Sequence, residues 1–402
     1  MKMKTQKSNN KISKEIYFDG AANTPVDKKV FRAMKPYLIN NYVGNSSSTH
    51  EHGINSARAL MEARKTCASI FKCTPEEVYF TSGATEGNNW VIQSLALHEK
   101  MFNGMQKNHI IVSNIEHSSI LNTCKELENW GFKITYLPTR QGVVSVRDLK
   151  QAIKPTTLLI CIMSVNNELG TTNPIVQLSR MAKKRKVLFL CDCTQSVGYG
   201  GDNIRLCSIY PSVDYFTFSA HKIYGPTGVG CLIARKDAPL YSMIHGGSQE
   251  QGLRGGTSNL VGIIGMIQAI KMMDSKSLKK HYLDLFNYFV ANLPKDIHLS
   301  FNVMKPTHYS IMNIRLTKAK TIFSKDYTLA DALINKGIAC SSTSACDLQD
   351  ETKDPALSHV LLVVGLTEQE IVSSARISFT KYTTKKDINK LIKALEAINK
   401  GE

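Results

Sequence analysis

The sequence predicts an α/β protein, with a large domain built on a mostly parallel central sheet and a smaller α+β domain at the C-terminal end. Three observations support this prediction. The 402 residues are enough for two domains. From residue 16 to about residue 271, short apolar strand-like runs alternate with helix-like segments, a rhythm typical of parallel sheets. After residue 271 this alternation stops.

The strands expected in the first region are short runs rich in β-branched and aromatic residues. They lie at residues 77–80, 109–112, 158–163, 187–190, 213–218 and 229–234. Polar clusters follow several of these runs. Because ligands of such sheets bind beyond the carboxyl ends of the strands, we expect the functional site there.

The second region predicts different elements: helices at residues 278–293, 329–336 and 385–399, and strands at 311–316, 338–342 and 375–379. We therefore divide the chain into four parts. The basic segment 1–15 is expected to be disordered, and the segment 16–28 to pack with the small domain. The large domain then covers residues 29–272 and the small domain residues 273–402.

The chain carries 50 lysines and arginines against 33 aspartates and glutamates, a formal net charge of +17. Such a balance can attract nucleic acid or acidic proteins. No RNA-binding motif with interleaved aromatic residues accompanies the lysines. We therefore interpret the excess as solvated faces and expect no direct contact with nucleic acid.

The ten cysteines are scattered, and some, such as Cys161, stand in apolar segments. Buried free cysteines are typical of a reducing compartment, and the spacing predicts no metal site. The N-terminus has no apolar signal region, and no apolar run reaches membrane-spanning length. These features predict a cytoplasmic protein without a membrane partner.

Two charged residues at strand ends predict a cofactor. Lys222 follows the run 213–218, where a lysine in a low dielectric can lose its proton and form an imine. Asp192 ends another buried run. A lysine for covalent attachment and an aspartate for a pyridinium nitrogen are the two parts that pyridoxal phosphate requires. Alone, either residue also fits an ordinary loop lysine or helix cap, so the prediction depends on their combination.

Two runs with glycines can bind a phosphate. Residues 82–89 lie between a strand and a helix, where small residues and free N–H groups attract an anion. Taken alone, this run also fits an ordinary helix start. Residues 246–257 form a second glycine-dense stretch that ends in Thr257, and a flexible surface loop is its alternative interpretation.

Three further residues are candidates for contact with a cofactor or substrate. His117 can stack on a flat ring and move protons, and the amide of Asn167 can hold a cofactor oxygen or a substrate carboxylate. A loop histidine and a polar turn are the alternatives. Arg376 lies in a strand-like run, and a buried arginine needs a partner. A substrate carboxylate held in a bidentate fork and a structural salt bridge fit equally well.

Cys346 precedes the hydrophilic stretch 347–355. A cysteine in such a loop is accessible for nucleophilic attack. Its acidic neighbours disfavour the thiolate, so activation would have to come from the bound substrate or the active site. An incidental surface thiol is the alternative.

With these motifs in this order, the chain resembles the cysteine desulfurases of the NifS/IscS type, in the class V aminotransferase branch of fold-type I pyridoxal-phosphate enzymes. The resemblance runs from about residue 16 to about residue 393. It is carried by residues 21–27, 44–50, 81–86, 116–117, 165–170, 192–198, 219–226, 254–257, 344–346 and 376.

The resemblance implies roles toward pyridoxal phosphate. Lys222 would hold the cofactor and act as acid and base on the substrate carbons. Asp192 would keep the pyridine nitrogen protonated, Gln195 would bond the phenolic oxygen, and His117 would stack on the ring and help proton transfer. The cofactor phosphate and its surroundings would be contacted by Gly83, Ala84, Thr85, Ser219 and His221.

The resemblance also implies the reaction and its partners. Arg376 and Asn167 would orient L-cysteine, with Asn167 also contacting the cofactor. Cys346 would attack the substrate sulfur, leaving L-alanine and a persulfide for an iron–sulfur scaffold or a tRNA thiolation factor. Thr257 would reach the cofactor phosphate of a partner subunit, which implies a homodimer. The alternatives are a selenocysteine lyase, a class V aminotransferase and a non-catalytic, cofactor-bound protein that binds a partner.

Overall fold

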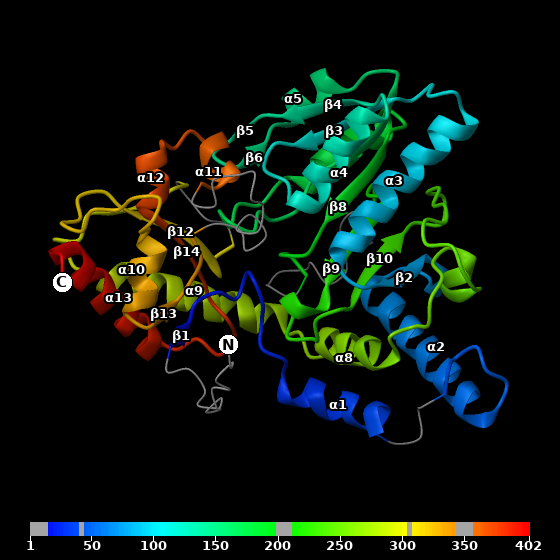
Figure 1. Cartoon of the computed structure of the whole chain (residues 1–402), viewed down its shortest axis with the longest axis horizontal. Helices are drawn as coiled ribbons and strands as arrows, with labels where there is room; N and C mark the ends of the chain where they lie inside the picture. The colour runs from blue at the N-terminus through cyan, green and yellow to red at the C-terminus, as the bar shows by residue number, and fades with distance from the viewer. Residues whose placement is uncertain (1–14, 40–43, 198–210, 304–307, 343–356) are drawn as a thin grey trace, which may run out of the picture.

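The structure is a computed structural model that describes residues 15–39, 44–197, 211–303, 308–342 and 357–402. Two predictions, the disordered segment 1–15 and the position of Cys346, therefore lie outside the described residues, apart from Glu15. Figure 1 shows a larger half built around a central sheet and a smaller half that holds the C-terminus. The chain that follows the first described strand runs between the two halves.

The larger half is built on a seven-stranded sheet in which β10 alone runs antiparallel to its neighbours. The mostly parallel arrangement confirms the predicted fold class. In spatial order the strands are β2 (Val78–Thr81), β10 (Gly230–Ala234), β9 (Tyr215–Ser219), β8 (Leu188–Asp192), β7 (Thr157–Cys161), β3 (His109–Ser113) and β4 (Lys133–Leu137).

Helices cover both faces of this sheet (Figure 1). Phe71 of α2 packs on Phe218 of β9, with ring centroids 5.1 Å apart, whereas Trp90 of α3 packs against the opposite face. One face is covered by α3 (Ala84–Phe102) and α4 (Ser118–Asn129), the other by α2 (Glu51–Phe71), α5 (Val146–Ala152), α6 (Ile175–Lys184) and α8 (Leu260–Lys271). An outer helix, α1 (Lys28–Ile39), packs on α8.

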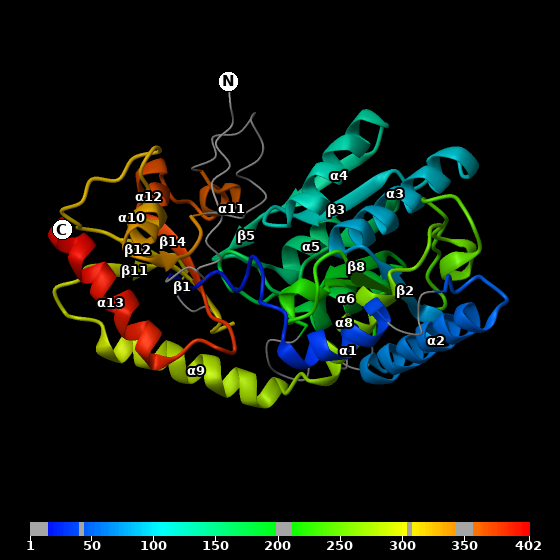
Figure 2. The same ribbon diagram turned by 60° about the horizontal axis from the view of Figure 1, so that its bottom comes forward.

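The smaller half contains an antiparallel sheet of β11 (Leu299–Phe301), β12 (Ile311–Leu316) and β14 (Ser374–Ser378). Figure 2 shows α9 and α13 along the lower edge of the smaller half, with α9 extending toward the larger half. Its helices are α9 (Ser275–Asn292), α10 (Leu329–Asn335), α11 (His359–Val363), α12 (Glu368–Val372) and α13 (Lys385–Lys400). The hairpin of β5 (Thr139–Arg140) and β6 (Val143–Val144) belongs to the larger half.

The first described strand joins the smaller half. β1 (Ile16–Tyr17) pairs in parallel with β13 (Ile338–Ala339), and the ring of Phe18 lies 6.0 Å from that of Phe379. The chain then crosses to the larger half, where α1 begins. We retain the domain boundaries after residues 28 and 272 as a proposal.

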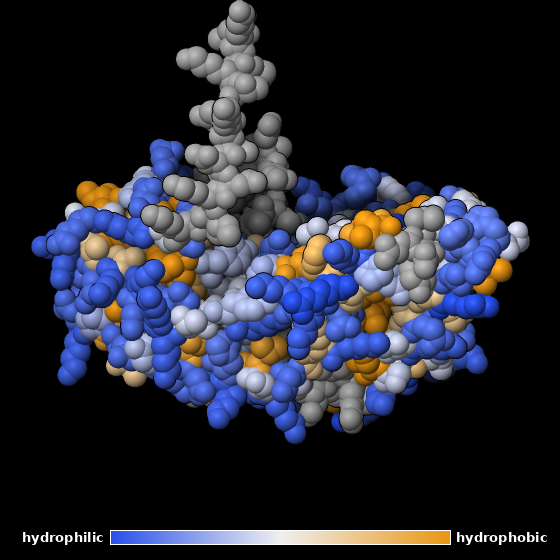
Figure 3. All heavy atoms as spheres, turned by 90° about the horizontal axis from the view of Figure 1, so that it is seen from below, coloured by the Kyte–Doolittle hydropathy of each residue, from blue (hydrophilic) through white to orange (hydrophobic). Residues whose placement is uncertain are grey.

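Hydrophilic side chains cover most of the face shown in Figure 3, with small apolar patches between them. Within the described ranges, no helix has the length and apolarity needed to cross a membrane. The same residues contain no group of histidine, cysteine and acidic side chains that could hold a metal ion, and the eight cysteines described are all free.

Candidate functional site

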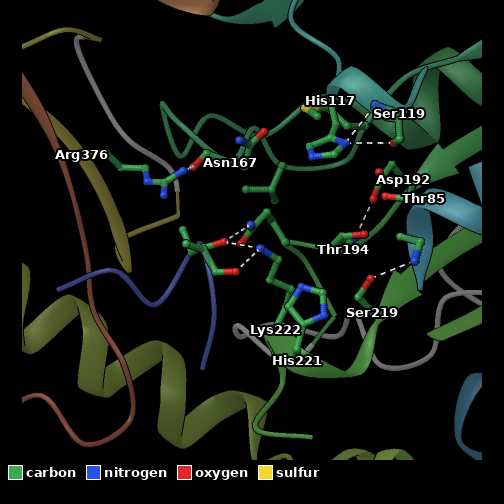
Figure 4. A pocket seen from close by; sticks show the side chains of 16 residues that line it. Thr85, His117, Ser119, Asn167, Asp192, Thr194, Ser219, His221, Lys222 and Arg376 are labelled. Atoms are coloured by element: carbon green, nitrogen blue, oxygen red, sulfur yellow. Dashed lines mark hydrogen bonds between the residues drawn. The ribbon is translucent and has the colours of Figure 1, made fainter. Parts of the chain in front are cut away.

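A cavity of about 210 Å³ opens beyond the carboxyl ends of β8 and β9. Figure 4 shows side chains from both halves converging on it. Ten of the residues predicted for the site line this cavity: Ala84, Thr85, His117, Asn167, Asp192, Gln195, Ser219, His221, Lys222 and Arg376. The structure thus brings together residues that are spread over most of the chain.

Lys222 ends a short 3₁₀ turn (Ala220–Lys222) that directly follows β9. Its Nζ donates hydrogen bonds of 2.6 Å to the carbonyl oxygens of Ala21 and Ala22 (Figure 4). The amine is therefore held inside the cavity by backbone from the N-terminal part of the chain. An amine in this position is placed to bond covalently with a carbonyl compound in the cavity.

Asp192 forms part of the cavity wall as the last residue of β8, and it is only 6% exposed. Its Oδ2 accepts a hydrogen bond of 2.9 Å from the Nδ2 of Asn88, and its Oδ1 accepts one of 2.9 Å from the N–H of Thr194. The Oδ1 of Asn88 in turn accepts from the hydroxyl of Thr217 at 2.6 Å. These bonds fix a buried carboxylate that can face a cationic ring nitrogen.

The N-terminus of α3 provides the groups expected for a phosphate. The N–H of Ala84 donates to the Oγ of Ser219 at 2.8 Å, and Thr85 follows on the exposed side. Gly230 of β10 makes this arrangement possible, because a Cβ there would lie 2.6 Å from the Cα of Gly83. A helix start with free N–H groups and hydroxyls attracts an anion.

Two histidines face the cavity. His117 caps α4, and its Nδ1 lies 2.9 Å from the Oγ of Ser119 and accepts from the N–H of the same residue at 3.1 Å. Burial, with the nearby charges of Lys222 and His117, lowers the pKa of His221 to about 4. His221 is therefore neutral at pH 7, with one ring nitrogen as donor and one as acceptor.

The cavity contains polar atoms that no described residue satisfies. The Oε1 of Gln195 and the Oγ1 of Thr194 are buried and have no hydrogen-bond partner among the described residues. Gln195 is held in place by its Nε2, which donates to the carbonyl of Ala21 at 2.9 Å. Buried polar atoms without partners are costly, so these two atoms are suited to a polar ligand. Together with Lys222 and Asp192, they fit pyridoxal phosphate.

Arg376 reaches the opposite side of the cavity from β14 and is 1% exposed. Its Nη2 donates to Oδ1 of Asp19 at 2.8 Å, and its Nη1 donates to the carbonyl of Asn167 at 3.2 Å. Its Nε has no partner among the described residues. The salt bridge that the sequence left open is thus present, and the guanidinium also retains N–H groups for a carboxylate, since it carries five donors.

Two predicted residues lie elsewhere. Gly83 precedes α3 and is not part of the cavity wall. Thr257 lines a second cavity together with Arg254, Gly228 and Ser82. In the glycine-dense loop that ends at Thr257, the buried Glu250 anchors the chain to Arg64 at 2.7 Å. Cys346 is outside the described residues.

Sequence reasoning missed several residues of the site. Asn88 stands within the run 82–89, and its spacing could have indicated it, because it lies one helical turn after Ala84. Ser119 lies two residues after His117, in the first turn of α4. Ala21 and Ala22 contribute only backbone carbonyls, which no side-chain pattern reveals. Asp19 precedes them and carries no signal of its contact with Arg376.

The comparisons with known proteins agree with this geometry. The sequence model of the family described as aminotransferase class-V matches residues 16–391. Cysteine desulfurase IscS of Dictyoglomus turgidum is 37% identical over 96% of this chain and 95% of its own length. The human cysteine desulfurase is 35% identical over 94% of this chain and 80% of its own length.

Solved structures show the same relationship. A NifS-like protein superposes with a TM-score of 0.81 at 30% identity, covering 96% of this chain and 99% of its own. SspA in complex with cysteine superposes with a TM-score of 0.77 at 33% identity, covering 92% and 99% of the two chains. Both comparisons support the predicted pyridoxal-phosphate enzyme fold. The chain therefore belongs to the class-V aminotransferase family, among its pyridoxal-phosphate-dependent cysteine desulfurases.

Proposed function

We propose that this protein is a cysteine desulfurase that converts L-cysteine into L-alanine and leaves the sulfur as a persulfide on Cys346. The observation that carries the proposal is one cavity containing Lys222, Asp192 and Arg376. The three residues supply an amine for covalent attachment, a carboxylate for a ring nitrogen and a guanidinium for a substrate carboxylate. L-Cysteine offers the matching amino and carboxylate groups.

The residues around the cofactor would divide its binding between them. The carboxylate of Asp192 would hold the ring nitrogen in its protonated form, and the free Oε1 and Oγ1 of Gln195 and Thr194 would meet polar atoms of the ring. His117 would contact the ring, and Thr85 and Ser219 would bind the phosphate with the start of α3. When bound, pyridoxal phosphate withdraws electrons from the substrate carbon atoms.

The residues around the substrate would orient it and move its protons. Arg376 and Asn167 would fix the carboxylate, and the amine of Lys222 would take the proton from Cα. The Sγ of Cys346 would attack the substrate sulfur, so that an S–S bond forms as the C–S bond breaks. The electron pair of the broken bond stays with carbon, which is protonated to give alanine.

Two substitutions test this proposal with purified protein. Lys222→Ala should abolish the visible absorbance of covalently bound cofactor. Cys346→Ser should keep that absorbance but stop the release of alanine and sulfide from L-cysteine in the presence of a thiol reductant. Cys73→Ser, two residues after α2 and outside the cavity, is the matched control and should remain active.

Other outcomes would indicate other functions. Sulfide release by Cys346→Ser at the wild-type rate would remove the role of this cysteine, and retained turnover of selenocysteine alone would indicate a selenocysteine lyase. A requirement for a keto acid would indicate an aminotransferase. A wild-type protein that binds the cofactor without turning over cysteine would be a partner-binding protein.

The assembly and location of the protein belong to the same proposal. Thr257 would complete the phosphate site of a second subunit in a homodimer, which is consistent with its place in a separate cavity. The persulfide would pass to an iron–sulfur scaffold or a tRNA thiolation factor. Free cysteines suit a reducing compartment, so we place the protein in the cytoplasm. Mixing Thr257→Ala with Lys222→Ala should restore one functional site per heterodimer only if subunits share sites.

A further inference from the structure

Residues 19–24, which we call the strap, cross the cavity between the two halves of the molecule. The strap begins beside β14, where the N–H of Ala21 donates to the Oγ of Ser378 at 2.9 Å. It ends beside the turn that carries Lys222, where Thr24 is bound. One short segment thus touches both the amine and the guanidinium of the proposed active site.

Thr24 holds the backbone on both sides of Lys222. Its hydroxyl donates to the carbonyl of His221 at 2.8 Å and accepts from the N–H of Tyr224 at 2.7 Å. Its own N–H donates to the same His221 carbonyl at 2.9 Å. With 2% of its surface exposed, Thr24 makes these bonds without competition from solvent.

The hydrogen bond from the N–H of Tyr224 to the hydroxyl of Thr24 has a structural reason. The N–H groups of Ile223 and Gly225 both donate to the carbonyl of Ala220. Tyr224, between them, has a φ of 66°, a conformation that residues with side chains rarely adopt. Its N–H therefore points away from the turn, and the hydroxyl of Thr24 accepts it. The sharp turn after Lys222 depends on a side chain supplied by the strap.

The strap also provides acceptors for the amine itself. The carbonyls of Ala21 and Ala22 both accept from Nζ of Lys222 at 2.6 Å. An ammonium group removed from water needs such acceptors. In the proposed reaction the ε-amine of Lys222 would act on Cα of the substrate, so it needs a fixed position in the cavity.

At its other end the strap contacts the substrate side of the cavity. The carboxylate of Asp19 pairs with Arg376 at 2.8 Å. The guanidinium is almost completely buried, and Asp19 is the acidic side chain that pairs with it among the described residues. Asp19 therefore orients Arg376, whereas Thr24 contacts only the Lys222 side.

We propose that the strap is a positioning element of the active site, in which Thr24 fixes the turn of Lys222 and the carbonyls of Ala21 and Ala22 receive the released ε-amine. Thr24 is accordingly a positioning residue, not a catalytic one. This inference rests on the proposed function, because it assigns a resting place to Lys222 during that reaction.

The test compares Thr24→Val with Thr24→Ser in the cofactor-loaded protein. Valine keeps the shape but removes both side-chain hydrogen bonds, whereas serine keeps them. Thr24→Val should lower kcat for L-cysteine about tenfold or more and leave KM within about twofold, because small displacements of a reacting group are costly while Arg376 is untouched. The pH midpoint of the cofactor absorbance should also move, by about half a unit, since the surroundings of the lysine change. Thr24→Ser should restore both properties.

Thr328→Val is the matched control, because it also removes two bonds of a buried threonine, to Asp331 at the start of α10. It should lower thermal stability without moving the absorbance midpoint or kcat. If Thr24→Val matched Thr328→Val in both readouts, the strap would have only a structural role and the inference would be wrong. A wild-type protein that failed to turn over cysteine would instead overturn the proposed function.

Discussion

Glu116, the residue before His117, is a buried carboxyl that the fold keeps in its protonated form. It is completely buried, and its Oε1 accepts from the N–H of Met163 at 2.9 Å and from the hydroxyl of Ser113. Its Oε2 has no partner among the described residues. Burial, with a smaller contribution from the charge of Asp192, raises the pKa of this carboxyl to about 8. Glu116 is thus largely protonated at pH 7.

Glu116→Gln should therefore change how stability depends on pH. Between pH 4.5 and about 8 the folded wild-type protein holds a proton that the unfolded chain has released, so its free energy of unfolding falls as the pH rises. Glutamine resembles the neutral acid but has no proton to lose. The melting temperature of the variant relative to wild type should rise by a few degrees from pH 5.5 to pH 8.

The control for this comparison is Glu62→Gln, since Glu62 is exposed on α2. The difference in melting temperature between Glu62→Gln and wild type should stay constant over the same pH range. If the difference in melting temperature between Glu116→Gln and wild type also stayed constant, the carboxyl of Glu116 would be ionised in the folded protein.

Among the elements, β10 lies close to the proposed phosphate site. This strand runs antiparallel between β2 and β9 and passes directly behind the start of α3. At Gly230 a Cβ would lie 2.6 Å from the carbonyl oxygen of Phe218 and from the Cα of Gly83. Both contacts are with backbone, so no side chain can turn aside to make room.

Gly230→Ala should accordingly push the start of α3 away from Ser219 and weaken binding of the cofactor. We expect the dissociation constant of pyridoxal phosphate to rise about tenfold or more, which corresponds to about 1.4 kcal/mol. Absorbance titration of the apoprotein measures it. Gly337→Ala is the control, because a Cβ there meets open space and only the backbone, with a φ of 76°, is strained. An unchanged cofactor affinity in Gly230→Ala would contradict the proposed place of the phosphate.

Elements with strong local signals could be predicted from the sequence. The strands β7, β8 and β9 are buried throughout or nearly so, and their continuous apolar runs indicated them. The edge strand β4 is partly exposed and has no such run. The strap could not be found in this way, because its contacts join residues near 20 to residues near 222 and 376. Such contacts depend on how the halves meet, which local patterns do not encode.

At the scale of the whole molecule, the two halves are joined beside the active site by a cluster around Asp27. Its carboxylate accepts from the ammonium of Lys381 and, at 2.8 Å, from the hydroxyl of Tyr382. The same ammonium lies 4.2 Å from the ring centre of Tyr224, two residues after Lys222. Partial burial would raise the pKa of Asp27, but the hydrogen bonds from Lys381, from the N–H of Lys29 and from Tyr382 lower it to about 2.

Lys381→Met should destabilise the protein at pH 7 by about 1.5–3 kcal/mol, the usual value of a hydrogen bond to a charged group. Because the folded pKa lies below the unfolded value of 3.8, this difference from wild type should shrink as the pH falls from about 4 toward 2. The free energies of unfolding of both proteins, measured with urea at pH 7 and between pH 4 and pH 3, give this difference. Lys65→Met, which breaks an exposed pair with Glu62, should have almost no effect. Equal effects of the two substitutions would mean that the junction contributes nothing beyond a surface contact.

The pairing of β1 with β13 places Ile16 opposite Ile338, and this has a consequence for biosynthesis. At roughly 5–20 residues per second, a ribosome releases the second strand tens of seconds after the first. Until then the nascent chain cannot close the wall formed by residues 19–24, even if its parallel sheet has already collapsed. Vitamin B6 capture should therefore be a late, post-translational event, completed only after the C-terminal third has emerged.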